Sequence, residues 1–437
     1  MRHLLLATAL LAAPAYAGFP QSTTLRGGAT EPDYAAAVKA DYDRDLGKLW
    51  DDFHRNPELS FKETKTVARM AQELRKVSGM QVTEKVGGTG VVGVLKNGDG
   101  PVVLLRADMD GLPVEEKSGL PNASKVRQVG VDGVETPVMH ACGHDTHVAM
   151  LVGAARLLAE RRDELAGQVV LMMQPGEEGF HGARYMLEEG LLDVVPEAPV
   201  SGAFALHISS TMASGSVNVR PGPVMAAADQ WAVTFRGRGG HASEPHRAAD
   251  PIPAAAELVL ALQAMVTRRV DVFDPAVVTV AHLQAGSTNN VIPDAAFLEG
   301  TIRTLSAERR ADVVAAVQRV ATHVAAAHEL AVEFDHQQGY PVTINDAGAA
   351  ARVLEAVAAM LGEQAAVLLP APLMGAEDFS YVLQEVPGAL AWIGARPPGV
   401  DPADAPANHS NLVVFDEEPL PAGAALYAQM ALRALSD

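Results

Sequence analysis

The run PVVLLRAD (Pro101 to Asp108) decides how the fold of this chain is interpreted. It is a short apolar run that ends in charged residues, as a buried β-strand does. Three more runs have the same character: GVVGVL (90–95), QVVLMMQ (168–174) and SGAFALH (201–207). Helical stretches lie between several of them, notably VAMLVGAARLLAERRDEL (148–165). This alternation predicts an α/β fold in which helices cover both faces of the sheet.

The length of the chain and a second pattern indicate two domains. A chain of 437 residues is too long for one ordinary hydrophobic core. From about Met225 the apolar runs alternate with polar residues, as in half-buried strands, and two helical stretches lie among them. The order strand–helix–strand–strand–helix–strand is that of a ferredoxin-like domain. We therefore expect a main domain formed by residues 34–224 and 338–437, with residues 225–337 inserted between its two parts.

The first residues have the pattern of an export signal. A short basic start precedes the apolar run from Leu4 to Ala13, and Ala15-Tyr16-Ala17 is a small-x-small cleavage site. The run is too short to span a bilayer, and a cleaved signal is preferred to an uncleaved anchor or a buried first helix. We expect a signal peptide at 1–17 and a flexible lead-in at 18–33. The mature protein is then periplasmic or secreted, without membrane insertion.

Charge excludes one class of partner. The formal net charge is −19. A surface this acidic repels the phosphate backbone, so we expect no nucleic-acid partner.

The only cysteine of the chain lies among three histidines, in MHACGHDTH (139–147). A single cysteine cannot form an internal disulfide, and a free thiol in an oxidising compartment is open to oxidation unless it is buried or coordinated. Thiolate and imidazole are good ligands for zinc and similar divalent metals. Cys142 and His144 lie two residues apart in a loop that contains glycine, so both can face one metal. A buried cysteine beside chance histidines is the alternative.

Polar residues also follow the other apolar runs, in RADMDGLP (106–113), in QPGEEG (174–179) and at His207. Ligands of open α/β sheets bind at the carboxyl ends of strands. In QPGEEG one carboxylate can hold a metal while its neighbour reaches a water, which suits metal-assisted hydrolysis. Taken singly, a turn at Asp108 and Asp110, a solvated acidic loop and a structural histidine are the alternatives.

The motifs occur in a fixed order along the chain. The set is completed by GRGGHASEPH (237–246), NNVIPD (289–294), GTIRT (300–304) and GAEDFS (375–380). It resembles the aminoacylase/carboxypeptidase-type metallo-amidohydrolases of peptidase family M20, and most of all the branch of hippurate, N-acyl-amino-acid and indoleacetyl-amino-acid hydrolases. The likeness runs from about His54 to the C-terminus. It implies a zinc-peptidase-like catalytic domain with a mixed sheet covered by helices, and an inserted ferredoxin-like domain that serves as lid and dimerisation domain.

The resemblance further implies a site for two divalent metal ions, which could be zinc, manganese, cobalt or nickel. Its ligands would be Cys142, His144, Glu178, His207 and His409. At the last of these the chain departs from the family, which usually shows a His-Asn-Pro-like sequence where this chain has His-Ser-Asn. Glu177 would be the general base, and Asp108 would orient a ligand or stabilise its charge.

The inserted domain would supply further groups. His241 matches a histidine that polarises the scissile carbonyl and that can reach the active site of a partner subunit, so the resemblance implies a homodimer. Asn290 and Arg303 match positions that bind the free carboxylate of the substrate. The run from Gly375 to Ser380 would line the substrate pocket.

The expected activity is hydrolysis of the amide bond of an N-acyl amino acid, by attack of a metal-bound water with Glu177 as the general base. A carboxypeptidase or dipeptidase that cleaves short peptides is the first alternative. A non-catalytic exported binding protein is the second, and it would be expected to have lost Glu177 or the ligands.

Overall fold

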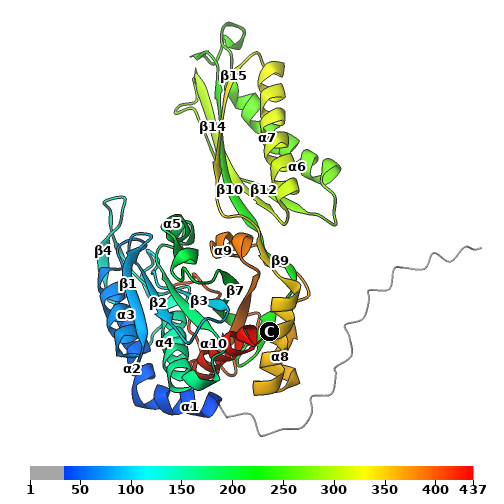
Figure 1. Ribbon diagram of the computed structural model, residues 1–437. Helices are drawn as coiled ribbons and strands as arrows, with labels where there is room; N and C mark the ends of the chain where they lie inside the picture. The colour runs from blue at the N-terminus through cyan, green and yellow to red at the C-terminus, as the bar shows by residue number, and fades with distance from the viewer. Residues whose placement is uncertain (1–33, 437) are drawn as a thin grey trace, which may run out of the picture. The chain divides into compact units, whose positions relative to one another are not determined.

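The computed structural model describes residues 34–436 (Figure 1). The predicted signal peptide (1–17) and lead-in (18–33) lie outside the described residues. In the described part of the chain, no helix is long and apolar enough to cross a membrane.

The larger of the two main sheets has eight strands in the order β1-β2-β6-β3-β7-β18-β8-β17. Their bounds are β1 Met80–Val86, β2 Gly90–Leu95, β3 Val102–Asp108, β6 Gln168–Gln174, β7 Val200–Ala213, β8 Val217–Val219, β17 Ala366–Leu368 and β18 Gly388–Arg396. The sheet is mixed, because β3 runs parallel to β6 and β7 whereas β2 runs antiparallel to both β1 and β6. Strands β2, β3 and β6 are buried throughout, as their continuous apolar sequences predict.

Helices cover both faces of this sheet (Figure 1). Successive side chains of a strand point to opposite faces, and Val103 and Leu105 of β3 belong to one core whereas Val102 and Leu104 belong to the other. The first core includes α1 Tyr34–Asp41, the π-helical turn η1 Tyr42–Leu46, α2 Gly47–Arg55, α3 Thr64–Lys76, α4 His144–Glu160, α8 Ala347–Leu361 and α10 Leu420–Leu435. The second includes α5 Gly182–Glu188, α9 Ser380–Glu385 and the 3-10 turn η3 Leu191–Asp193.

The inserted segment forms its own antiparallel sheet, in the order β12-β14-β10-β15. Its elements are β10 Ala227–Arg236, α6 Pro251–Arg269, β12 Ala276–Ala285, β14 Ala295–Thr304, α7 Ala307–Ala327 and β15 Ala331–Gln338. Both helices pack on one face of this sheet around Trp231, Val233 and Phe235. The strand and helix order is ferredoxin-like, and the predicted fold class of a helix-covered mixed sheet with an inserted α+β domain is confirmed.

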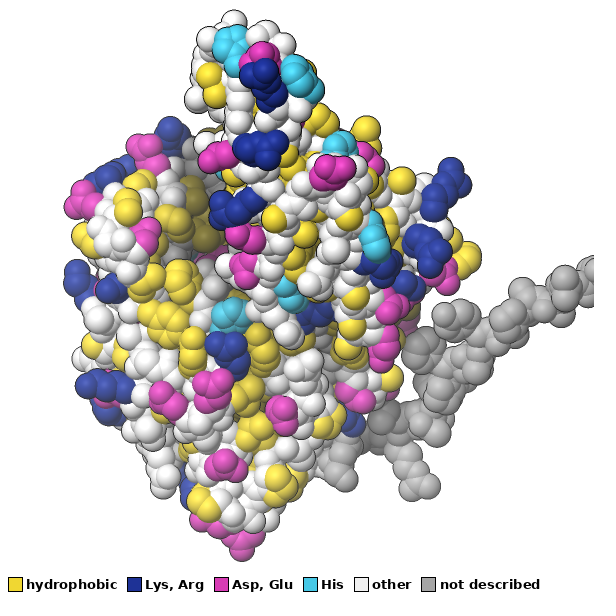
Figure 2. Space-filling model, turned by 90° about the horizontal axis from the view of Figure 1, so that it is seen from above, with side chains coloured by type: hydrophobic (Ala, Val, Ile, Leu, Met, Phe, Trp, Pro, Cys, Tyr) yellow, Lys and Arg dark blue, Asp and Glu magenta, His cyan; other side chains and the backbone are white. Residues whose placement is uncertain are grey.

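Short elements complete the fold. They are β4 Arg127–Val129 with β5 Glu135–Pro137, β9 Gly222–Met225 with β16 Thr343–Asn345, β11 Gly240–His241 with β13 Val291–Ile292, and the turns η2 Arg162–Glu164, η4 Pro245–Arg247 and η5 Glu363–Ala365. On the face seen in Figure 2, basic side chains are interspersed with acidic ones and form no continuous basic patch.

Candidate active site

Several of the predicted site residues lie at or near the level where β3 and its parallel neighbour β6 end. Asp108 is the last residue of β3, the Glu177 loop follows β6, and His207 lies within β7. Helix α4 begins at His144, directly after Gly143 and its φ of 87°. A Cβ at Gly143 would lie 2.4 Å from Ile208 Cγ2, so only glycine allows this close approach of the loop to β7.

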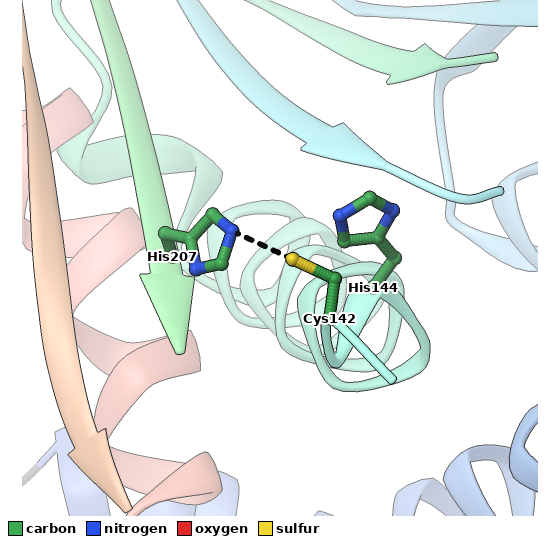
Figure 3. A group of neighbouring side chains, drawn as sticks. All are labelled: Cys142, His144 and His207. Carbon is green, nitrogen blue, oxygen red and sulfur yellow. Dashed lines mark hydrogen bonds between the residues drawn. The ribbon is translucent and has the colours of Figure 1, made fainter. Parts of the chain in front are cut away.

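The five predicted ligand side chains lie together. Cys142 Sγ lies 3.4 Å from His207 Nε2 and 3.2 Å from His409 Nε2 (Figure 3 shows the first contact). His409 Nε2 is 3.2 Å from Glu178 Oε1, and His144 Nε2 is 4.0 Å from the same oxygen. Residues from four separate segments of the chain therefore lie close enough together to hold metal ions.

The ligand geometry leaves donor atoms available. His207 Nδ1 donates to the carbonyl oxygen of Ile208 at 2.7 Å, which directs Nε2 toward Cys142. Buried oxygen and nitrogen atoms of Asp108 (Oδ2), His144 (Nε2) and Glu178 (Oε1) make no well-aligned hydrogen bond, although charged groups lie close to each. Thiolate, imidazole and carboxylate donors arranged in this way fit divalent metal ions.

The electrostatics of the cluster keep Cys142 ionised. Burial alone would raise the pKa of its thiol, but His207 and His144 lower that pKa well below its usual value. Burial alone would lower the pKa of the His207 imidazole. The Cys142 thiolate outweighs this effect and raises that pKa to about 8. A thiolate is the form of cysteine that binds metals.

Glu177 has a different environment from the other carboxylates of the site. It is buried, and burial followed by repulsion from Glu377 and Glu178 raises its pKa well above the usual value. A carboxylate whose pKa is raised toward neutrality can both accept and return a proton. For Glu178, burial and the Cys142 thiolate raise the pKa to about 7, against the opposing effect of His409.

Asp108 lies behind the cluster, where the resemblance predicts an orienting role. Its Oδ1 accepts a hydrogen bond from His147 Nδ1 at 2.5 Å, and its Oδ2 lies 2.8 Å from Arg106 Nη1. His147 Nε2 accepts the N–H of Ile208 at 2.8 Å. Burial lowers the pKa of His147 to about 4, so the imidazole is neutral and carries its proton on Nδ1.

A cavity of about 770 Å³ opens onto the cluster. It is lined by Cys142, Glu177, Glu178, His207 and His409 together with Arg303 of β14 and Gly375 of the GAEDFS run. Apolar side chains form another part of its wall: Met212, Met225, Leu373 and Trp392.

Two of the predicted residues lie elsewhere. His241 of β11 and Asn290 line a second cavity, of about 870 Å³, whose walls include none of the cluster residues. His241 Nδ1 accepts hydrogen bonds from the N–H and the hydroxyl of Ser243. Within one described chain, Asn290 and Arg303 therefore do not share a cavity, although the resemblance assigns them to one carboxylate.

The structure also gives roles to three residues that the sequence analysis did not place in the site. Asp110 accepts the backbone N–H groups of Glu177 and Glu178, at 3.1 Å each. Its place in RADMDGLP was the available signal. Tyr340 contacts the same loop and had no motif around it. His54 hydrogen-bonds through Nδ1 to Asp145 at 2.8 Å, and its position two residues before an Asn-Pro pair gave no hint of this contact.

Comparison with known proteins agrees with the motifs. The model of the family described as peptidase family M20/M25/M40 matches residues 104–433. The chain is 38% identical to N-acetylcysteine deacetylase of Bacillus subtilis, over 87% of this chain and 94% of that protein. It is 38% identical to thermostable carboxypeptidase 2 of Saccharolobus solfataricus, over 87% and 93% of the two chains.

Among solved structures, a dinuclear metal-binding peptidase of the M20 family from Bacillus subtilis superimposes with a TM-score of 0.75 at 33% identity. The match covers 91% of this chain and 99% of that one. The family model spans most of the chain, the relatives match over nearly their whole length, and the resemblance predicted from the ordered motifs is confirmed. This chain belongs to peptidase family M20/M25/M40.

Proposed function

We propose that this protein is a metal-dependent amidohydrolase that cleaves the amide bond of N-acyl amino acids. One observation carries the proposal: Glu177, with its raised pKa, lines the same cavity as Arg303 and four residues of the donor cluster, Cys142, Glu178, His207 and His409. Membership of a hydrolase family and the deacetylase named among the relatives support the same reaction class.

The donor cluster would hold two divalent ions through Cys142, His144, Glu178, His207 and His409. Such ions, when bound, acidify water and polarise a carbonyl group. Glu177 accepts a proton from the attacking water at a carboxylate oxygen and returns it to the amide nitrogen as the C–N bond breaks. Asp108 binds His147, which accepts the backbone N–H of Ile208, so this pair fixes β7 next to the ligand His207.

Substrate selection rests on two parts of the cavity wall. The Arg303 guanidinium can bind the free carboxylate of the amino acid in a bidentate way, which places the scissile amide near Glu177. The apolar wall of Met212, Met225 and Leu373 suits an apolar acyl group or side chain.

The decisive experiment compares Glu177→Gln with wild type on N-acetyl and N-benzoyl amino acids and on dipeptides, with the bound metal measured in both. Loss of turnover with metal retained supports Glu177 as the base. Glu188→Gln is the matched control, because Glu188 is a largely exposed residue of α5. Equal turnover of Glu177→Gln and wild type would contradict the mechanism.

The same panel separates the alternatives. A carboxypeptidase relative at 38% identity keeps peptide hydrolysis open as a second function, and faster cleavage of dipeptides than of N-acyl amino acids would select it. A protein that binds these compounds and hydrolyses none of them would be a binding protein.

The remote position of His241 leads to a proposal about assembly. In this structure His241 lines a cavity separate from the cluster, and a second copy of the chain would supply such a histidine at the scissile carbonyl. We therefore propose a homodimer through the inserted domain. Mixing Glu177→Gln with His241→Ala tests it: hybrid dimers contain one site with both native groups, so activity should exceed that of either variant alone. No gain on mixing, with hybrids verified by mass, would exclude the trans arrangement.

We further propose that the protein is exported from the cytoplasm. The pattern of residues 1–17 supports a cleaved signal and a periplasmic or secreted protein. N-terminal sequencing of protein from fractionated cells should begin at Gly18, and a cytoplasmic protein that retains Met1 would contradict this.

A further inference from the structure

The turn Glu177–Glu178–Gly179, named here the base turn, is held by side chains on two sides. Asp110 accepts the N–H groups of its first two residues. On the other side, Tyr340 Oη donates to the carbonyl oxygen of Glu177 and accepts the N–H of Gly179 at 2.7 Å. The Gly179 N–H also lies 2.7 Å from the Glu177 carbonyl oxygen, so the phenol closes a tight three-residue turn.

Tyr340 comes from the segment that leads back from the inserted domain. It lies two residues after the end of β15. The preceding residue, Gly339, donates its N–H to Asp229 Oδ1 at 3.0 Å and accepts from Arg310 Nη2 at 3.0 Å. Arg310 of α7 also pairs with Asp229 of β10 through Nε, at 2.8 Å. The phenol is therefore fixed in place by the inserted domain, although it acts on a loop of the catalytic domain.

The two hydrogen bonds of the Tyr340 phenol on the base turn are to backbone groups. The phenol thus sets the direction in which the Glu177 side chain leaves the chain and takes no proton from its carboxylate. Tyr340 is 6% exposed, and burial followed by the nearby Asp378 and Glu177 carboxylates raises its pKa far above the usual value. The phenol keeps the O–H that it donates.

We propose that Tyr340 is a positioning residue for Glu177, which clamps the base turn from the inserted domain and aligns the general base with the donor cluster. The inference rests on the proposed role of Glu177. A general base gives its full rate only when its oxygen is held at the reacting atom. A looser turn therefore lowers the rate of the chemical step more than it changes substrate binding.

Tyr340→Phe tests the proposal, because it removes one hydroxyl and keeps the buried ring. We expect kcat to fall roughly tenfold to a hundredfold, with KM changed less than about twofold. Tyr381→Phe is the matched control: Tyr381 belongs to the same aromatic group, and its hydroxyl contacts His181 and Gly339 rather than the base turn. Its kcat should stay within about twofold of wild type.

Hydrogen exchange of the metal-free proteins gives a second readout that needs no turnover. A peptide that contains Gly179 should exchange about tenfold faster in Tyr340→Phe than in wild type or Tyr381→Phe. Unchanged exchange, an unchanged kcat, or equal losses in both variants would overturn the proposal. If Glu177→Gln and wild type turn over alike, the proposed function fails instead, whereas the exchange result still decides whether Tyr340 clamps the turn.

Discussion

Arg106 Nη1 lies 2.8 Å from Asp108 Oδ2, and both side chains are completely buried. The same guanidinium lies 2.7 Å from Glu377 and 3.4 Å from Asp378. Three carboxyl groups therefore share one cation behind the donor cluster.

Replacement of Arg106 by Met should lower the free energy of unfolding by about 3–5 kcal/mol, because three buried carboxylates lose their common counter-ion. Urea unfolding of the metal-free protein, followed by circular dichroism, measures the change. Arg236→Met is the matched control, since Arg236 forms an exposed pair with Glu333 and such pairs stabilise proteins little. Equal effects of the two substitutions would show that burial of the Arg106 pair is unimportant.

Alkylation of Cys142 should report metal binding directly, because it is the only thiol of the chain. Its pKa lies well below the usual value for a thiol, because His207 and His144 outweigh its burial, and its side chain lines the cavity, so iodoacetamide should label the metal-free protein. Added zinc should slow labelling roughly tenfold or more, because a coordinated thiolate is a poor nucleophile. Mass spectrometry of the intact protein gives the labelled fraction. The same labelling rate with and without zinc would argue against Cys142 as a ligand.

Arg303→Ala should lower kcat/KM more for substrates that carry a free carboxylate than for substrates that lack it. For an N-acyl amino acid, kcat/KM should fall about 10- to 100-fold, since hydrogen bonds to charged groups contribute about 1.5–3 kcal/mol. For the N-acyl amino acid amide, in which an uncharged carboxamide replaces the carboxylate, the loss of kcat/KM should be much smaller. Initial rates with the two compounds measure the difference. Equal losses for both would place the carboxylate elsewhere in the cavity.

The buried His54 should make stability depend on alkaline pH. Burial alone would lower its pKa, but hydrogen bonds to Asp145 and Glu116 raise it from 6.5 to about 10. A histidine with a raised pKa in the folded state stabilises the fold fully below about pH 6.5. That stabilisation is lost as the pH rises through about 10.

The free energy of unfolding of His54→Gln should therefore be lower than that of wild type near pH 6, and the difference should shrink toward pH 10. Denaturant unfolding at a series of pH values measures it. His282→Gln is the control, because His282 forms an exposed pair with Glu299, and it should change the free energy of unfolding little. A wild-type advantage that grows with pH would reverse the sign and refute the assignment.

The sequence predicts the buried strands best. The expected runs at 90–95 and 168–174 coincide with β2 and β6, because continuous apolar sequence has only one stable place in an α/β sheet. Helix α4 begins four residues earlier than its apolar pattern suggests, at His144, because the positive φ of Gly143 starts it. Strand β1 (Met80–Val86) was not predicted, since its alternating exposure gives a weak apolar signal.

Some residues of the site could likewise be predicted from the sequence, and others could not. Cys142, His144 and Glu178 stand in motifs, so sequence order alone brings them to attention. Tyr340 and Asp110 act through backbone groups of a distant loop, at separations of 163 and 67 residues from Glu177. Contacts of that kind depend on how the two parts of the chain pack, so the motif around Asp110 does not reveal its partners and Tyr340 has no motif at all.

The inserted domain leaves and rejoins the chain through neighbouring strands. Asp229 of β10 pairs with Gln338 of β15, so the two connections lie one hydrogen-bonded strand spacing apart. The whole inserted domain is thereby connected to the catalytic domain through two neighbouring strands, as the two strands of a hairpin are. Exchange of the inserted unit at this junction would reroute no strand of the large sheet, but it would have to keep Arg303 in the cavity wall and the Asp229–Arg310 pair that anchors Gly339 beside Tyr340.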